Sequence, residues 1–119
     1  KMFTKIIKYD LLLDFSDITL YNLKIISRMS PFGIGNNRPV FRTNNCSIDD
    51  QLKFIGKESQ IVKSKIKDQF GNKLQFICFD KKDSLVNTNS KFDILYTVNI
   101  NSFTGIEKLE ITIKEISLN

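Results

Sequence analysis

The chain has 119 residues, a hydrophobic content of 41%, a charged content of 26% and a formal net charge of +5. These values are typical of one soluble globular domain and exclude a disordered chain, which lacks the apolar residues for a core. No apolar run approaches the roughly 20 residues of a membrane-spanning helix, and the first residues do not resemble a signal peptide, so we expect a cytoplasmic protein.

Helix signals dominate the first part of the chain. Residues 5–9 are predicted to form a short strand, and Ser16 or Asp17 can cap the first turn of a helix. Apolar residues then recur at helical spacing, which predicts a helix over residues 17–29 whose apolar stripe packs on another part of the protein. Pro31 ends this helix, because the residue before a proline is pushed out of the helical region.

From Pro39 onward the pattern changes from helix to strands. The predicted strands are residues 39–48, bending toward Phe54, and residues 61–67, 73–79, 92–101 and 109–116. Residues 68–72 predict a hairpin connection, and the polar segment 81–91 has room for one short helical turn. Five strands with a longer break between the third and the fourth are the order expected of an OB-fold.

The sequence therefore predicts a mainly β fold, a five-stranded OB-fold Greek-key barrel with an N-terminal α-helix. Residues 1–38 are expected to form a linker strand, the helix and a connector containing proline and glycine, and residues 39–119 the barrel. Another small barrel, or an open sheet that carries a helix, is the alternative.

The residue types that carry catalysis are scarce. The sequence has no histidine, the commonest general base and metal ligand. Asp49 and Asp50 are adjacent, and adjacent side chains of an extended chain point to opposite faces, so they are poorly placed to share a metal. Cys46 and Cys78 form no C-x-x-C pair and have no identifiable base, which predicts buried thiols. We expect no catalysis, metal or cofactor within this chain.

Positive charge is concentrated in the middle of the chain. Residues 53–82 contain eight lysines and three acidic residues, so this stretch accounts for the whole net charge. If Val62, Ser64 and Ile66 point inward, the lysines of the second predicted strand share its outer face. These lysines are Lys63, Lys65 and Lys67. They then lie about 6–7 Å apart, close to the phosphate spacing of an extended single strand. A solvated lysine-rich surface without a ligand is the alternative interpretation.

Aromatic residues lie beside this basic strand in the predicted loops. Phe54 and Phe103 either stack on bases or pack in the core, and the same loops carry Lys57 and Lys108. Other phenylalanines are expected to fill the core: Phe32, Phe41, Phe70, Phe76, Phe79 and Phe92. The pattern of residues 73–79 leaves open which face of that strand points outward.

A basic strand with aromatic neighbours favours single-stranded nucleic acid as the ligand. We expect the cationic residues to contact phosphates and Phe54 and Phe103 to stack on bases. Asn36 is expected to shape the path of the bound nucleic-acid backbone. The predicted binding residues are Lys57, Lys63, Lys65, Lys67, Lys73, Arg38, Arg42, Asn36, Phe54 and Phe103.

The segment from Pro31 to Phe41 is the most distinctive stretch of the chain. It reads Pro-Phe-Gly-Ile-Gly-Asn-Asn-Arg-Pro-Val-Phe. It resembles the Pro-Phe-Gly-x-Gly-Asn-x-x-Pro-x-Phe segment of the RecJ family, single-strand-specific 5′→3′ exonucleases among the DHH phosphoesterases. The resemblance extends over nearly the whole chain and includes the strand from Val62 to Asp68. Ser64 departs from it, because the family pattern has an aliphatic residue there.

The resemblance implies an accessory single-stranded-DNA-binding domain cut from a longer nuclease of DNA repair and recombination. The DHH motifs that bind Mn²⁺ or Mg²⁺ in that family are absent here, so the metal and the catalytic core are expected elsewhere in the parent protein.

The partners implied are single-stranded DNA, the catalytic domains of the parent chain and a single-strand-binding protein, with no membrane. The alternative is a protein-interaction module that braces those catalytic domains or receives the acidic tail of a single-strand-binding protein. A stand-alone small nuclease is a third reading, which the missing histidines oppose.

Overall fold

The computed structural model describes residues 11–28, 39–80, 85 and 91–118 of the chain. The strand predicted at residues 5–9 lies outside this part, and so do Asn36 and Arg38 of the connector. The segment expected to hold a short helical turn is described only at Leu85, which is buried, and at Lys91.

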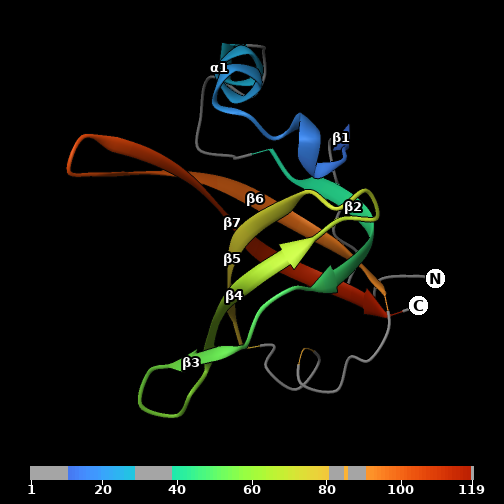
Figure 1. Ribbon diagram of the computed structural model, residues 1–119, viewed down its shortest axis with the longest axis vertical. Helices are drawn as coiled ribbons and strands as arrows, with labels where there is room; N and C mark the ends of the chain where they lie inside the picture. The colour runs from blue at the N-terminus through green and yellow to red at the C-terminus, as the bar shows by residue number, and fades with distance from the viewer. Residues whose placement is uncertain (1–10, 29–38, 81–84, 86–90, 119) are drawn as a thin grey trace.

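Seven strands, one 3-10 turn and one α-helix make up the described part of the chain (Figure 1). In chain order they are β1 (Leu11–Leu12), η1 (Phe15–Asp17), α1 (Leu20–Arg28), β2 (Phe41–Ile48), β3 (Lys53–Ile55), β4 (Ile61–Lys67), β5 (Lys73–Phe79), β6 (Phe92–Phe103) and β7 (Ile106–Leu118). The predicted mainly β character is confirmed, but the sheet has seven strands where five were expected. β1 was not predicted, and β3 is a separate strand instead of a continuation of the first predicted one.

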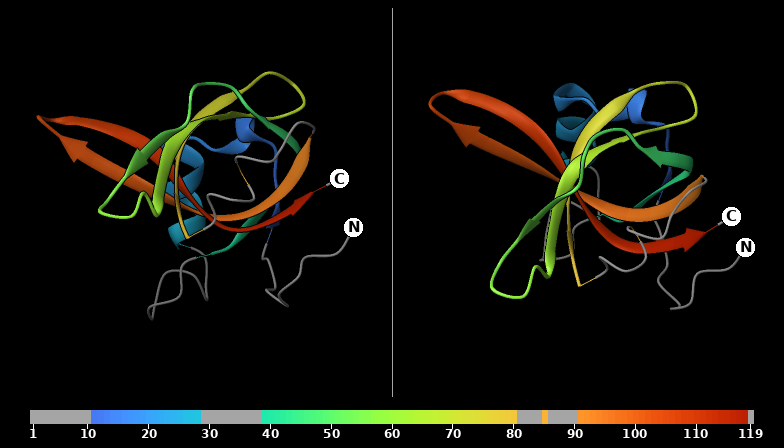
Figure 2. Two further views of the ribbon diagram at one scale, coloured as in Figure 1. Left: turned by 90° about the horizontal axis from the view of Figure 1, so that it is seen from below. Right: turned by 60° about the horizontal axis from the view of Figure 1, so that its bottom comes forward.

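Hydrogen bonding between the strands closes on itself. The sheet order is β1-β2-β6-β7-β5-β4-β3, and β2 also pairs with β4. This second pairing is short, with Ser47 opposite Lys67 and Ile48 opposite Ile66. The pairings therefore join β2, β6, β7, β5 and β4 in a closed ring. All five strands of this ring contribute buried side chains to the core cluster. The β3–β4 and β6–β7 hairpins project from the same side of the molecule (Figure 2).

A bulge allows β2 to contact both of its partners in the ring. Its register against β6 shifts between Thr43 and Cys46, and Asn45 at the shift has a φ of 59°. The backbone amide of Asn45 donates to the Asp93 carboxylate at 3.0 Å, and the side-chain amide of Asn45 donates to Gln69 of the β4–β5 turn at 3.4 Å. The extra residue bends β2 away from β6, so that its end reaches β4.

Two buried hydroxyl groups attach the N-terminal segment to the ring. Thr43 Oγ1 lies 2.7 Å from the Leu13 carbonyl and 2.7 Å from the Tyr96 hydroxyl. Because the Thr43 hydroxyl has one proton and donates it to Leu13, the Tyr96 hydroxyl must donate to Thr43. Burial raises the pKa of Tyr96, so the phenol keeps its proton and the chain of hydrogen bonds is maintained.

The helix begins later than predicted because its cap is a different residue. Thr19 Oγ1 accepts a hydrogen bond from the backbone amide of Asn22 at 3.0 Å, which satisfies a free amide of the first turn. Ser16 and Asp17, the predicted caps, belong to the preceding 3-10 turn.

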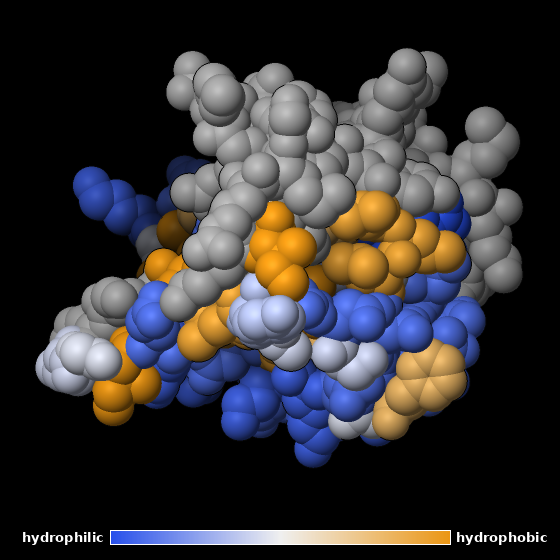
Figure 3. Space-filling view, turned by 90° about the horizontal axis from the view of Figure 1, so that it is seen from above, coloured by the Kyte–Doolittle hydropathy of each residue, from blue (hydrophilic) through white to orange (hydrophobic). Residues whose placement is uncertain are grey.

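Only part of the apolar stripe of α1 packs against the core. Leu23 contacts the core cluster, whereas Tyr21 and Ile25 are 73% and 40% exposed. Seen from the side of α1, the surface mixes apolar and hydrophilic areas (Figure 3). No helix in the described residues combines the length and apolar character needed to cross a membrane.

A buried carboxylate joins the β4–β5 turn to the N-terminal segment. Asp68 is 3% exposed. It accepts hydrogen bonds from the backbone amides of Phe70 at 3.0 Å, Asn72 at 2.9 Å and Phe15 at 2.9 Å. Burial by itself raises the pKa of Asp68, but these bonds and one from the Asn72 side chain outweigh it, and the pKa lies below the ordinary value of an aspartic acid. Gly71 supplies the φ of 90° that the turn requires.

Replacing Asp68 by alanine should lower the free energy of unfolding by about 3 kcal/mol, because three backbone amides lose a charged acceptor. Urea denaturation followed by circular dichroism measures the change. Glu107→Ala removes an exposed carboxylate and, as the control, should change the free energy by less than about 0.5 kcal/mol. Equally small effects of both substitutions would contradict the stabilising role of Asp68.

The lowered pKa of Asp68 also makes stability depend on pH. As pH falls, the Asp68 carboxyl takes up a proton earlier in the unfolded chain than in the folded one. The contribution of Asp68 to the free energy of unfolding is therefore complete above the unfolded pKa and is lost as pH falls through the folded pKa. Below about pH 4 the free energy of unfolding should fall more steeply for the wild type than for Asp68→Asn, which cannot titrate. Parallel stability curves for the two proteins from neutral to acid pH would refute this.

Candidate functional site

Buried residues and lysines alternate along β4. The buried residues are Val62, Ser64 and Ile66. The outward residues are Lys63, Lys65 and Lys67. The predicted orientation of the lysine row is therefore confirmed. Ser64 occupies an inward position because its hydroxyl donates to the Gln51 carbonyl at 3.0 Å, which satisfies the only polar group of its side chain.

β5 has a definite inner and outer face, which the sequence left open. The partners of the buried β4 residues are Leu74, Phe76 and Cys78. Because directly opposite residues lie on the same face of a sheet, Gln75, Ile77 and Phe79 share the outer face with the lysines. Lys73 lies opposite Lys67 at the start of β5.

The outer surfaces of β3, β4, β5 and β7 form one continuous face, which we name the lysine face. Its members follow from the strand registers: Lys53, Ile55, Ile61, Lys63, Lys65, Lys67, Lys73, Gln75, Ile77, Phe79, Glu110 and Thr112. The sheet order places this face between the β6–β7 and β3–β4 hairpins (Figure 1).

One end of the lysine face is apolar. Ile55, Ile61 and Phe79 lie opposite one another on β3, β4 and β5. Ile55 is 43% exposed and Phe79 is 46% exposed. The assignment of Phe79 to the core is therefore wrong, and so is that of Phe70, which is 66% exposed in the β4–β5 turn. The register of the β4–β5 hairpin is what places Phe79 outside, because it sets Phe79 opposite Ile61, which shares a face with Lys63.

The aromatic residues proposed for stacking are placed differently from expectation. Phe54 is 45% exposed, but it lies opposite the inward-facing Val62 and so belongs to the other face of the β3–β4 hairpin. Phe103 pairs with Ile106 at the end of the β6–β7 hairpin, and its side chain is outside the described part of the structure. Neither residue is therefore shown to lie on the lysine face.

Carboxylates border the lysines on two sides. Asp49 lies 3.8 Å from the Lys67 ammonium and 3.1 Å from the Lys73 ammonium. A hydrogen bond from Lys73 lowers the pKa of Asp49. Glu110 lies 3.9 Å from the ammonium of Lys63. The lysine side chains of these pairs are 44–57% exposed, so a phosphate can reach the same ammonium groups.

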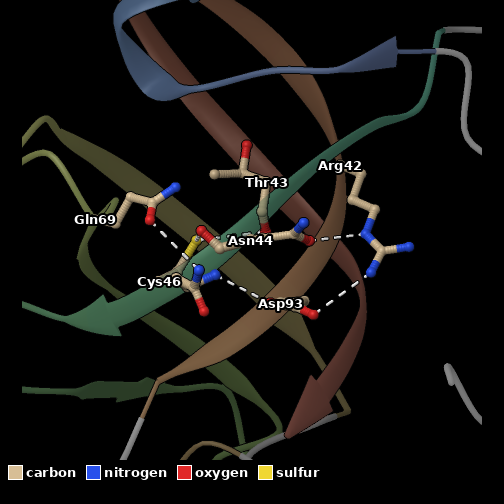
Figure 4. Close-up of polar contacts among 7 residues, drawn as sticks. Arg42, Thr43, Asn44, Cys46, Gln69 and Asp93 are labelled. Carbon is tan, nitrogen blue, oxygen red and sulfur yellow. Dashed lines mark hydrogen bonds and ion pairs between the residues drawn. The ribbon is translucent and has the colours of Figure 1, made fainter. Parts of the chain in front are cut away.

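The other predicted cations lie apart from this row. Arg42 donates to Asn44 at 2.8 Å and forms an ion pair with Asp93 at 3.5 Å (Figure 4), and its side chain is 21% exposed. These contacts give Arg42 a structural role between β2 and β6. Lys57 is exposed in the loop that joins β3 to β4.

A shallow hollow lies in the lysine face, with a volume of about 190 Å³. Its lining comes from four strands and the segment before β3. It includes Asp50, Lys53, Lys63, Lys65, Gln75 and Glu110, together with the buried residues Ser64 and Phe76. The hollow therefore offers ammonium, amide and carboxylate groups within one small area, a combination that the sequence alone did not indicate.

Metal-binding groups do not gather in the described part of the chain, where no cluster of three histidine, cysteine or acidic side chains could hold an ion. Cys46 and Cys78 are buried free thiols, as expected. Burial and nearby carboxylates raise the pKa of Cys46, which disfavours the reactive thiolate.

Comparison with known proteins identifies the family. The comparison with curated proteins found no match to this chain. The model of the RecJ OB domain family matches residues 9–115, which include the N-terminal segment, α1 and most of the sheet. Since this match spans nearly the whole sequence, the chain belongs to the RecJ OB domain family, a non-catalytic domain of a nuclease family.

Proposed function

We propose that this domain binds single-stranded DNA for a RecJ-like 5′→3′ exonuclease of DNA repair and recombination. The catalytic core of that enzyme, with its Mn²⁺ or Mg²⁺, lies outside this chain, and the domain holds the strand for it. The observation that carries the proposal is the row of three outward lysines on β4, which continues into an exposed aromatic residue on the same face.

The lysine row suits the backbone of a single strand. Side chains at alternate positions of a strand lie about 6–7 Å apart, so successive ammonium groups can meet successive phosphates of an extended chain. Lys53 lies opposite Lys63, and Lys73 lies opposite Lys67, which widens the row at both ends. Binding by such contacts releases condensed counterions and weakens as salt increases.

The place of this face in the fold supports the same conclusion. We take the ring β2, β4, β5, β7 and β6 as the five-stranded barrel of the OB-fold, formed by residues 39–119, with residues 1–38 as the linker. β4 and β5 are then its second and third strands. OB-folds bind oligonucleotides on these strands, between the loops that the β3–β4 and β6–β7 hairpins provide here.

Phe79 is the aromatic residue best placed to stack on a base. It lies beside Ile61 at the apolar end of the lysine face and is 46% exposed. Stacking on an aromatic ring tolerates any base, so this platform adds affinity without requiring a particular sequence.

Charge placement, and not net charge alone, should control binding. Lys65→Glu and Lys91→Glu change the net charge equally, and both residues are exposed, but only Lys65 lies on the lysine face. Fluorescence anisotropy of a labelled single strand should show that Lys65→Glu weakens binding about tenfold or more, while Lys91→Glu has a much smaller effect.

The salt dependence of binding is a second measure of the contacts between these lysines and phosphates. Replacing Lys63, Lys65 and Lys67 together with glutamine should reduce the slope of log K against log salt by about two, since each phosphate that a lysine neutralises on a single strand contributes about 0.7. Salt-independent binding by the wild type, or equal effects of Lys65→Glu and Lys91→Glu, would refute the proposal.

Phe79→Ala should weaken single-strand binding by about 1–3 kcal/mol, the usual contribution of one stacked base. Phe54→Ala is the matched control, since Phe54 is equally exposed but lies on the opposite face of the hairpin. Anisotropy titrations at constant salt measure both variants. A larger loss for Phe54→Ala would assign stacking to the other face and remove Phe79 from the site.

A protein-interaction role is the second candidate, and the partly apolar lysine face favours it as well. An acidic tail of a single-strand-binding protein would meet the same lysines and the apolar end formed by Ile55 and Phe79. Titration with an acidic peptide, compared with an oligonucleotide at equal salt, separates the two. Tight peptide binding without oligonucleotide binding would favour the interaction module.

A further inference from the structure

A polar row crosses the lysine face at right angles to the strands. Lys65 of β4 lies opposite Gln75 of β5, and Gln75 lies opposite Glu110 of β7. Glu110 in turn lies opposite Asn99 of β6. An ammonium, a carboxamide and a carboxylate therefore follow one another across three neighbouring strands, and all three line the hollow described above.

This order of groups is unsuited to a phosphate at the centre of the hollow. Glu110 and Asp50 both line it, and their carboxylates repel a phosphate, whereas Lys53, Lys63 and Lys65 attract it. The phosphates are therefore expected at the ammonium groups, and the part of a nucleotide that enters the hollow is the base.

We propose that the hollow binds a base that carries an exocyclic amino group, with Glu110 as the acceptor and Gln75 as a second hydrogen-bonding partner. This inference rests on the proposed single-strand binding and adds a base preference to it. A carboxylate accepts from the cytosine N4 amino group, and it can do so while paired with Lys63, because a carboxylate has about four acceptor sites.

Thymine is the base that this arrangement disfavours. It has a carbonyl oxygen where cytosine has the amino group, so the carboxylate of Glu110 would face another acceptor. The side chain of Glu110 is only 16% exposed, so it is shielded from the water that would relieve this mismatch. A partner with the wrong hydrogen-bonding pattern is rejected more strongly at such a site than one that merely fits less well.

The test compares oligo(dC) and oligo(dT) of equal length by anisotropy at one salt concentration and slightly alkaline pH. The two are matched because both are pyrimidine homopolymers with the same backbone charge. The wild type should bind oligo(dC) about tenfold more tightly than oligo(dT), the lower part of the range for one well-placed base contact.

Glu110→Gln should bring the ratio of the two affinities close to one, since an amide can donate to thymine as well as accept from cytosine. Glu107→Gln changes the net charge equally at an exposed position nearer the end of the β6–β7 hairpin, and should leave the ratio unchanged. Circular dichroism confirms that both variants are folded.

The outcomes separate this inference from the proposed function. Equal affinity of the wild type for oligo(dC) and oligo(dT) overturns the base preference and leaves single-strand binding intact. A preference that survives Glu110→Gln, or that disappears equally in Glu107→Gln, also overturns the assignment to this hollow. Absence of binding to either strand overturns the proposed function and this inference together.

Discussion

The buried carboxylate of Asp68 is the constraint on which the lysine face depends. It holds the amides of the β4–β5 turn and thereby sets the register of the two strands, with Lys65 opposite Gln75. Successive side chains of a strand point to opposite faces, so a shift of the register by one residue would turn every lysine of β4 toward the core. Its bond to Phe15 also holds the N-terminal segment against the same turn. The hydrogen bonds of Asp68 thus help to keep the lysines of β4 on the outer face.

The lysine face is not uniformly positive. Asp49 neutralises part of the charge at the end where Lys67 and Lys73 meet, and Glu110 does so near the middle. The lysine side chains of these pairs remain accessible to solvent, whereas the carboxylates are largely buried. The carboxylates therefore divide the face into areas of different charge.

Each difference between expectation and structure has a physical cause. Helical spacing could not distinguish Thr19 from Ser16 as the cap, since both have a hydroxyl group able to accept the same bond. Composition assigned Phe79 to the core because most phenylalanines are buried, but its cross-strand partner placed it outside. Arg42 was grouped with the other cations by charge, although Asp93, distant in the sequence, holds it between β2 and β6.

The amino-acid sequence alone determined the mainly β class, the bounds of β4 and β5, and the outward row of lysines. These follow from alternation along a single strand, which is a local property. Only the tertiary structure decided which face of β5 joins that row, where Phe54 and Phe79 lie, and that Glu110 meets Gln75. The first two placements depend on the registers of the β4–β5 and β3–β4 hairpins. The last depends on the parallel contact of β5 with β7, two segments far apart in the chain, and alternation along one strand does not show which strand it pairs with.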